Sequence, residues 1–408
     1  MVETLFKNPF RPGAGHMPPY LAGRKSESED FRKLLSQTTI LQNLVLTGLR
    51  GVGKTVLLET FKPMAIAEGW LWAGTDLSES MSITEDNLAI RLLTDLAVVT
   101  TSIAIHEPQP ATFFRQQVPP TQHPLNYQAL LGIYEAAPGL AADKLKAVLE
   151  LVWTNVSQLN KRGIIFAYDE AQNLSDHAAK EQFPLSLLLD VFQSLQRKNI
   201  PFMLALTGLP TLFPKLVEAR TYAERMFHVI SLGPLTSEET QQAVKVPLKA
   251  SKCPFPLSDE SITVIWTITK GYPYFVQYVC KEVYDVWVQN ANSGESLKPI
   301  PTDAITRKLD TDFFYGRWAR ATDRQRALMR VVADLENSND EFTVQDIVER
   351  SKIITPERPF SASLANQMLS ALGGHGLVYK NRHGKYLFAV PLMDQFIKRQ
   401  TDLTRPEA

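Results

Sequence analysis

The stretch that decides the fold is Gly48-Leu49-Arg50-Gly51-Val52-Gly53-Lys54-Thr55. It matches the pattern G-x-x-x-x-G-K-[ST] at every fixed position. The apolar run Leu44–Thr47 before it predicts a buried strand, and Val56–Phe61 after it continues as an amphipathic helix. A strand, a glycine-rich loop and a helix in this order predict a phosphate-binding loop.

The residue types in this loop suit a nucleotide. Glycines let backbone N–H groups curl around phosphates without Cβ clashes, and the helix N-terminus adds its positive dipole end. Lys54 is expected to reach the β and γ phosphates of ATP, and the Thr55 hydroxyl to hold Mg²⁺. The predicted contacts to ATP or ADP are Gly48, Leu49, Arg50, Gly51, Val52, Gly53, Lys54, Thr55 and Val56.

Composition indicates an ordinary globular protein of two or three domains. The chain has 408 residues, 44% of them hydrophobic, with 43 Lys plus Arg against 43 Asp plus Glu. A net charge of zero gives no general reason to expect nucleic acid as a partner. The N-terminus lacks a secretory signal, and the most apolar stretch, Leu88–Ile105, is interrupted by Arg91 and Asp95. Two sparse cysteines suit a reducing compartment, so we expect a cytoplasmic protein with no membrane contact.

The first 234 residues alternate apolar strands with helical patterns, which predicts a five-stranded, mostly parallel sheet covered on both faces. The proline-rich stretch His106–His123 reads as an inserted loop. Besides the strand before the phosphate-binding loop, we expect strands at Trp70–Thr75, Gly163–Tyr168, Pro201–Leu206 and His228–Leu232, and helices at Ser26–Leu41, Ser82–Val99 and Ala141–Asn160.

After Pro234 the strand pattern stops. A capping-box start at Thr236–Glu239 opens a helical region that extends to about Asn292, and Asn290–Pro301 resembles a linker. Three short helices, a hairpin and a final helix follow, which is typical of a winged helix. The predicted helices are Asp323–Leu335, Thr343–Ser351 and Ser361–His375; the hairpin strands are Leu377–Lys380 and Lys385–Phe388, and the last helix ends near Gln400.

Two acids end the strand Gly163–Tyr168. Nucleotide hydrolysis needs one carboxylate near Mg²⁺ and a second that orients or deprotonates the attacking water. Asp169 suits the first role and Glu170 the second.

For two further residues the sequence leaves two alternative roles each. Thr207 follows another strand, where it is expected either to hydrogen-bond the γ phosphate or the attacking water, or to cap the next helix. Arg225 precedes the fifth strand and either completes the site of a neighbouring copy or pairs with a surface acid.

In their order along the chain, these motifs resemble those of the AAA+ ATPases, specifically the origin-recognition/Cdc6-like and STAND branch. The resemblance implies a P-loop ATPase fold with a helical lid and a C-terminal winged helix. It divides the chain into an N-terminal segment (1–25) packed on the nucleotide site, an ATPase domain (26–234), a lid (235–295) and a winged-helix domain (312–408). Pro18–Arg24 resembles a segment that encloses the adenine, which implies Tyr20, Leu21 and Gly23 as nucleotide contacts. Gly271–Gln277 resembles a lid motif whose Pro273 packs against the nucleotide.

The chain also departs from this pattern, because no lid arginine lies near Pro273 and Tyr274 and the polar strand end is Thr207 and not Asn. Both departures favour slow hydrolysis. The leading hypothesis is therefore an ATP-dependent switch that forms a homo-oligomer when ATP is bound.

Two alternatives stay open. One is an ATP-regulated protein, such as an origin-type or transposition-type loader, that binds duplex DNA through the winged helix. The helix Ser361–Leu369 is almost uncharged. The basic residues available to contact DNA phosphates are Arg358, Lys380, Arg382, His383 and Lys385. The other is an interaction scaffold, such as one in phage defence, with an unknown protein partner.

Overall fold

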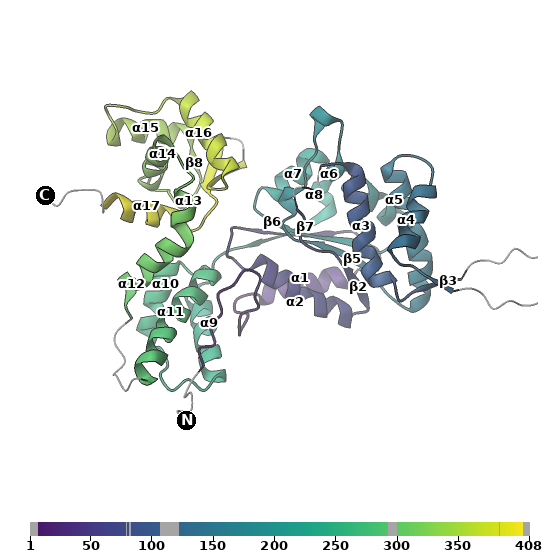
Figure 1. Cartoon of the computed structure of the whole chain (residues 1–408), viewed down its shortest axis with the longest axis horizontal. Coiled ribbons are helices and arrows are strands. Elements are labelled where there is room, and N and C mark those ends of the chain that lie inside the picture. Colours follow the sequence, from purple (N-terminus) through teal and green to yellow (C-terminus); the bar gives the residue numbers. More distant parts are fainter. Residues whose placement is uncertain are drawn as a thin grey trace, which may run out of the picture. The chain divides into compact units, whose positions relative to one another are not determined.

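The computed structural model describes residues 7–78, 80, 83–106, 122–292, 300–382 and 384–402. The chain forms two compact units (Figure 1). Unit 1 contains 1–24, 48–56 and 232–408, and unit 2 contains 25–47 and 57–231.

Unit 2 is built on the predicted sheet, whose strand order is β2-β5-β6-β1-β7. The pairings of β2 with β5, β5 with β6, and β6 with β1 are all parallel. The five strands are β1 (Asn43–Gly48), β2 (Trp70–Ala73), β5 (Gly163–Tyr168), β6 (Phe202–Gly208) and β7 (Phe227–Leu232). The predicted α/β class with a five-stranded parallel sheet is therefore confirmed.

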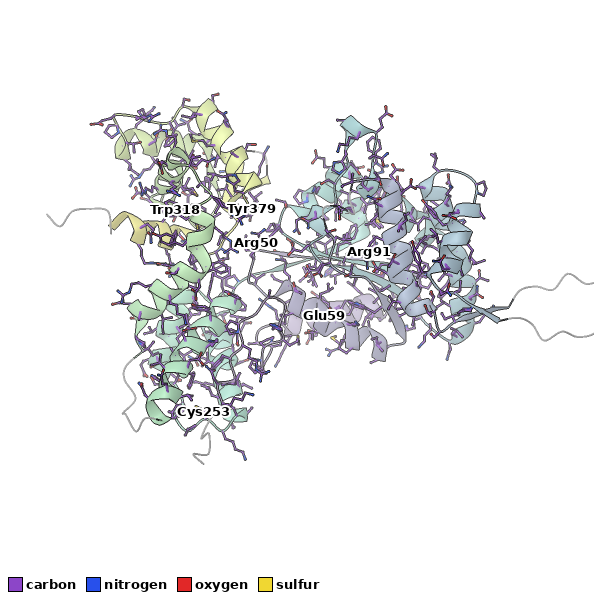
Figure 2. All side chains as sticks on the ribbon, in the orientation of Figure 1. Arg50, Glu59, Arg91, Cys253, Trp318 and Tyr379 are labelled. Carbon is purple, nitrogen blue, oxygen red and sulfur yellow. The ribbon has the colours of Figure 1, made fainter. Side chains whose placement is uncertain are left out.

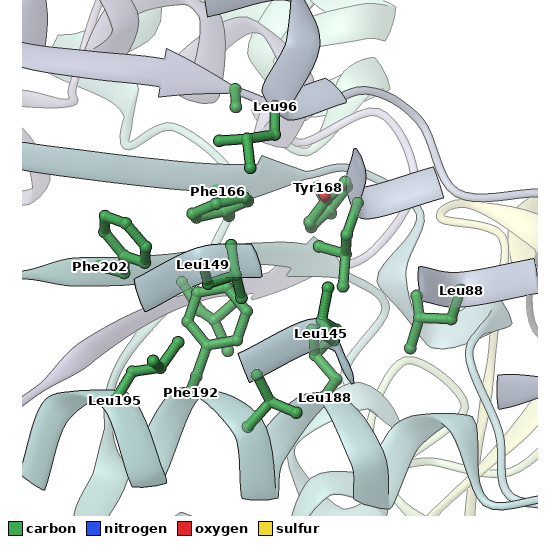
Figure 3. Close-up of a cluster of buried hydrophobic side chains, with 14 of the residues drawn as sticks. Leu88, Leu96, Leu145, Leu149, Phe166, Tyr168, Leu188, Phe192, Leu195 and Phe202 are labelled. Carbon is green, nitrogen blue, oxygen red and sulfur yellow. The ribbon is translucent and has the colours of Figure 1, made fainter. Parts of the chain in front are cut away.

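Apolar side chains cover both faces of this sheet. Every residue of β1, β5 and β6 is buried, as expected for central parallel strands. Figure 1 shows α1 and α2 on one face and α6 on the other. On the first face the rings of Phe31 and Phe61 stack with centroids 4.2 Å apart. On the second, Phe166, Phe192 and Phe202 belong to one large cluster with leucines of α3, α5 and α6 (Figure 3).

The helices of unit 2 differ from the prediction mainly at their ends. The helix expected at Ser26–Leu41 ends at Leu35, because the Gln37 side chain accepts the N–H groups of Leu41 and Gln42 and stabilises a turn. The pattern did not predict α4, α6, α7 or α8. The helices are α1 (Lys25–Leu35), α2 (Lys54–Ala67), α3 (Glu85–Thr100), α4 (Tyr127–Ala136), α5 (Ala141–Val156), α6 (Pro184–Arg197), α7 (Leu212–Ala219) and α8 (Ala223–Met226).

The predicted inserted loop is described only at its ends. Strands β3 (Ala104–His106) and β4 (Gln122–Pro124) pair antiparallel there, and the loop between them lies outside the described residues.

In unit 1 three helices form the predicted helical region: α9 (Ser237–Ala250), α10 (Asp259–Thr269) and α11 (Pro273–Asn292). The predicted capping box is present, since Thr236 accepts the N–H of Glu239 and the Glu239 carboxylate accepts that of Thr236. Phe10 of the N-terminal segment is buried in the core of these helices, with its ring centroid 5.6 Å from that of Tyr284. The N-terminal segment therefore packs on this core, as its apolar residues suggested.

The C-terminal part of unit 1 contains the predicted helices and hairpin. Strands β8 (Phe342–Thr343), β10 (Lys385–Phe388) and β9 (Val378–Arg382) form an antiparallel sheet in that order. The helices expected from Asp323, Thr343 and Ser361 begin within one residue of those positions. They are α14 (Asp323–Ala333), α15 (Val344–Ile354) and α16 (Ala362–Gly374), followed by α17 (Met393–Asp402). His383 lies outside the described residues.

A helical stretch before α14 was not predicted from the sequence. It consists of α12 (Thr302–Leu309), the π-helical turn η5 (Asp310–Tyr315) and α13 (Gly316–Trp318). Most of the predicted linker Asn290–Pro301 lies outside the described residues. In the described part of the chain, no helix has the length and apolar character needed to cross a membrane.

Candidate functional site

The phosphate-binding loop has the backbone that its glycines predict. β1 ends at Gly48 and α2 begins at Lys54, so the loop joins a buried strand to a helix N-terminus. Gly51 and Gly53 have φ angles of 82° and 91°, in the left-handed region that favours glycine. Lys54 is buried, and its Nζ donates to the carbonyls of Gly48 and Leu49 at 3.0 and 3.1 Å. The lysine ammonium therefore lies inside the curve of the loop.

Arg24 and Tyr274, to which the sequence motifs gave no role, donate hydrogen bonds to carbonyls of this loop. Arg24 is buried, and its Nη2 donates to the carbonyls of Val52 (3.1 Å) and Gly233 (2.7 Å). The backbone N–H of Tyr274 donates to the carbonyl of Gly51 at 3.1 Å. Arg24 is the last residue of Pro18–Arg24, a stretch on which the family resemblance partly rests. Its place in that stretch is the sequence signal that could have indicated its role.

The N-terminal residues assigned by resemblance lie close to the same elements. Gly23 has φ 63°, and a Cβ there would lie 2.5 to 2.8 Å from carboxylate atoms of Glu239, the acid of the α9 capping box. Tyr20 packs against Ala22, Leu235 and Ala243, and Leu21 is half-buried. These contacts place the segment against the start of α9.

Pro273 is the first residue of α11, directly before Tyr274. Gly271 precedes it with φ 72°, and a Cβ there would lie 2.0 Å from the carbonyl oxygen of Leu235. The N–H of Leu235 donates to the carbonyl of Gly271 at 2.8 Å. The glycine therefore permits a close backbone contact that sets the start of α11, whose N-terminal turn contacts the phosphate-binding loop through Tyr274.

The two predicted acids lie in unit 2, where they follow β5. Asp169 is buried, and its carboxylate accepts the N–H of Glu170 at 2.8 Å. Glu170 is exposed, with a left-handed φ of 52°. Its carboxylate accepts a hydrogen bond from the Gln172 amide.

Gln172 connects this acid to the end of the neighbouring strand β6. Its Oε1 accepts the N–H of Leu209 at 3.1 Å, and a Cβ on Gly208 would lie 2.6 Å from that oxygen. The ammonium of Lys215 donates to the Gln172 carbonyl at 2.7 Å, and burial lowers the pKa of Lys215. No sequence motif pointed to Gln172, because a glutamine two residues after the acids has no characteristic pattern.

Thr207 is fully buried at the end of β6 and pairs in register with Leu46 of β1. In the part of the chain that the structure describes, its hydroxyl has no hydrogen-bond partner, and the same is true of the Thr47 hydroxyl on β1. The helix-cap alternative for Thr207 is therefore wrong, since the N-cap position of α7 is Thr211. Two unpartnered hydroxyls on adjacent strand ends fit a site that presents polar groups to a ligand.

Arg225 lies in α8, just before β7, and its side chain is exposed. Among the described residues it forms no ion pair, whereas nearby Arg220 pairs with Asp190 at 2.6 Å. The alternative in which Arg225 pairs with a surface acid is thus not seen.

The loop fits a nucleotide polyphosphate, because its glycines are in the left-handed region and the lysine lies within its curve. The residues predicted to hold Mg²⁺ belong to different units, Thr55 to unit 1 and Asp169 to unit 2. No group of three or more His, Cys, Asp or Glu side chains suited to a metal occurs among the described residues. Mg²⁺ in phosphoryl-transfer sites commonly takes oxygen ligands from the nucleotide and from water as well as from the protein.

Comparisons with known proteins agree with this fold. A family model described as a domain of unknown function (DUF8462) matches residues 311–397. No curated protein sequence matches the chain. Among solved structures, the Walker-type ATPase PABY2304 of Pyrococcus abyssi is 15% identical, with 95% of this chain and 98% of that chain covered and a TM-score of 0.55.

The ORC2 protein of Aeropyrum pernix, in its ADP form, is 14% identical over 96% of this chain and 98% of its own, with a TM-score of 0.54. Both matches extend over nearly the whole length of each chain. The protein therefore has the fold of the Walker-type and origin-recognition-like P-loop ATPases, as its motifs predicted.

Proposed function

We propose that the protein is an ATP-binding switch that hydrolyses ATP slowly and couples its nucleotide state to oligomerisation or to a protein partner. The observation that carries this proposal is the hold on the phosphate-binding loop. Arg24 of the N-terminal segment and Tyr274 of α11 donate to adjacent carbonyls of the loop, those of Val52 and Gly51. Any change in the loop on nucleotide binding would therefore act directly on both elements.

In this proposal the residues of the chain have separate roles. Lys54 neutralises phosphate charge, and the backbone N–H groups of residues 48–56 bind phosphate oxygens. Thr55 and Asp169 hold Mg²⁺, and Glu170 orients and deprotonates the attacking water. Thr207 donates its hydroxyl to the γ phosphate or to that water. Support for a nucleotide also comes from the ORC2 structures, which are described as ADP and ADPNP–ADP forms.

The domain division follows from the same proposal. We assign 1–25 to a segment that encloses the adenine with Tyr20, Leu21 and Gly23, 26–234 to the ATPase domain, 235–295 to a lid that contacts the nucleotide through Pro273, and 312–408 to a winged helix. Three helices with a three-stranded antiparallel sheet support the last assignment.

The test is nucleotide binding and turnover in two variants. Lys54→Ala should lose ATP binding, because the loop then lacks the buried ammonium that lies inside its curve. Glu170→Gln should bind ATP as tightly as the parent and lose turnover by about a hundredfold or more. Calorimetry and a phosphate-release assay measure the two effects. Unchanged turnover in Glu170→Gln would remove the role assigned to this residue.

We further propose that Arg225 reaches the site of a second copy of the chain. Its exposure and lack of an ion pair among the described residues support this role. Light scattering of the Glu170→Gln protein should show assembly with ATP but not with ADP, and Arg225→Ala should lower turnover of the assembled protein. A monomer in every nucleotide state would reduce Arg225 to a surface residue.

The structure gives less support to duplex DNA as the partner. Arg382 is one of the basic residues predicted to contact DNA from the wing. Its guanidinium pairs with the carboxylate of Glu341, and Nε lies 2.9 to 3.0 Å from the two oxygens. Asn381 donates to the same carboxylate at 2.7 Å. If the wing binds DNA, Glu341→Gln should strengthen binding at low salt, because it frees a cation. No binding by either protein with ATP at low salt would exclude this function.

A further inference from the structure

The tip of the phosphate-binding loop contacts the C-terminal part of unit 1 as well as α11. Arg50, at the tip, is exposed (Figure 2). A Cβ on Gly376, in the turn between α16 and β9, would lie 3.5 Å from Arg50 Nη1 and 3.6 Å from Nη2. The Arg50 guanidinium therefore lies against a turn that the sequence places far from the loop.

Arg317, in α13, is the second cation at this place. Its guanidinium lies over the ring of Phe313, with Cζ 4.3 Å from the ring centroid, and it also donates to the Phe313 carbonyl. The Phe313 ring lies 5.4 Å from the ring of Tyr274, whose N–H donates to Gly51 next to Arg50. Arg317 is thus held by stacking on Phe313, whose ring lies beside Tyr274, the residue that contacts the loop.

Two other arginines lie near enough to Arg317 to act on its charge. Burial, and then the like charges of Arg50 and Arg320, lower the pKa of Arg317. Among the described residues neither Arg50 nor Arg317 forms an ion pair, whereas other arginines of the unit, Arg382 and Arg399, pair with carboxylates. Burial, and then the charge of Asp312, raise the pKa of Tyr274, and the Asp312 carboxylate accepts a hydrogen bond from the Tyr278 hydroxyl at 2.7 Å.

Arg50, which is exposed, and Arg317, which is half-buried, are like charges with no ion-pair partner among the described residues. Phosphate oxygens match the planar guanidinium fork and accept two hydrogen bonds from each arginine. The loop that carries Arg50 is itself the predicted phosphate-binding element. An anion at its tip would contact both arginines and reduce their repulsion.

We propose that Arg50 and Arg317 together bind the terminal phosphate of the nucleoside triphosphate, so that the C-terminal part of unit 1 distinguishes ATP from ADP. This inference rests on the nucleotide site proposed above, and it adds the regulation of that site. In this proposal Arg317, the cation that binds the third phosphate from α13, lies outside the predicted lid (235–295).

The test compares ATP with ADP by calorimetry in the full-length Glu170→Gln protein, which keeps ATP intact. Arg317→Ala and Arg50→Ala should each weaken ATP binding about ten- to a hundredfold, the loss expected for a charge-assisted hydrogen bond, and leave ADP affinity within about twofold. Arg307→Ala is the matched control, because Arg307 is an exposed arginine on the preceding helix, α12. It should change neither affinity.

Arg317→Glu provides a readout that a purely structural role would not move. The new carboxylate should pair with Arg50, so the nucleotide-free protein should melt at the same or a higher temperature while ATP binding weakens more than in Arg317→Ala. A lower melting temperature together with equal losses for ATP and ADP would overturn the proposal.

Other outcomes have separate meanings. Unchanged ATP affinity in both alanine variants would also overturn the proposal. It would be overturned too if Arg317→Ala weakened the binding of inorganic phosphate to the ADP complex but left ATP affinity unchanged. If the parent protein binds neither nucleotide, the proposed function itself fails, which is a different result from loss of discrimination.

Discussion

At the scale of single residues, Gln172 links the proposed catalytic acid to the next strand end. It donates to Glu170 and accepts the N–H of Leu209 at 3.1 Å, so it fixes the acid relative to the end of β6. Gln172→Ala should therefore lower kcat about tenfold, the effect of losing one positioning hydrogen bond, with little change in KM. Steady-state kinetics measures the two constants.

Gln172→Glu sharpens this prediction through pH. A carboxylate beside Glu170 repels the negative charge of that acid and disfavours its charged form. Because a general base acts when deprotonated, activity at low pH should fall and the acidic limb of the pH–rate profile should move to higher pH. Asn155→Ala is the matched control, since among the described residues that amide donates to the Leu151 carbonyl within α5. If Gln172→Glu changes KM alone, Gln172 does not position the acid.

Thr207 allows function and stability to be separated. Its buried hydroxyl has no partner in the described part of the chain, so Thr207→Val should leave the free energy of unfolding of unit 2 unchanged or raise it by up to about 1 kcal/mol. Turnover should nevertheless fall, because the proposed hydrogen bond to the γ phosphate or water is lost. Denaturant unfolding and phosphate release measure these quantities.

Thr100 supplies the contrast for this substitution. Its buried hydroxyl donates to the carbonyls of Leu125 (2.7 Å) and Leu96 (3.1 Å). Thr100→Val leaves a buried carbonyl with one partner fewer and should destabilise unit 2 by about 1–3 kcal/mol. Equal losses of stability in the two valine variants would show that the Thr207 hydroxyl has a structural partner after all.

At the scale of elements, Gly271 decides where α11 begins. Its φ of 72° and the 2.0 Å that would separate a Cβ from the Leu235 oxygen leave no room for a side chain. Gly271→Ala should destabilise unit 1 by more than about 1 kcal/mol. It should also weaken ATP binding, because Tyr274, which holds the loop, lies in the first turn of α11.

Gly374→Ala is the control for this prediction. Gly374 ends α16 without a positive φ, and no atom lies within 4 Å of a Cβ placed there. The alanine should stabilise unit 1 by up to about 1 kcal/mol through helix propensity. Thermal melts of both variants measure the difference, and a neutral Gly271→Ala would mean that α11 adapts its start.

Elements were predictable where local patterns decide them. β5 was predicted residue by residue, since its continuous apolar run is bounded by Gly163 and the acid pair. α9 begins directly after its predicted capping residue, Thr236, whereas α3, expected from Ser82, begins at Glu85 after the cap Thr84. The helical stretch of α12, η5 and α13 was missed because its residues Asp310–Tyr315 form a π-helical turn, which has no simple sequence period.

At the scale of the whole molecule, the loop itself was predictable from the sequence but its supports were not. Arg24, Tyr274 and Gly376 contact residues 50–52 from three distant parts of the chain. No single-sequence pattern encodes such contacts, because they depend on how the units fold and not on local periodicity. The motif identified the ligand class, and the tertiary contacts suggest how the ligand is sensed.

The two compact units should also unfold separately. Phe10 is buried in the core of α9–α11 in unit 1, and Phe192 lies in the core of unit 2, 5.0 Å from the Phe166 ring. Deleting a buried phenylalanine side chain costs about 3–5 kcal/mol. In hydrogen exchange, Phe10→Ala should therefore accelerate amides of α9–α11 and leave those of β5 and β6 protected, and Phe192→Ala should do the reverse. Equal loss of protection in both units from either substitution would mean that the chain unfolds as one cooperative body.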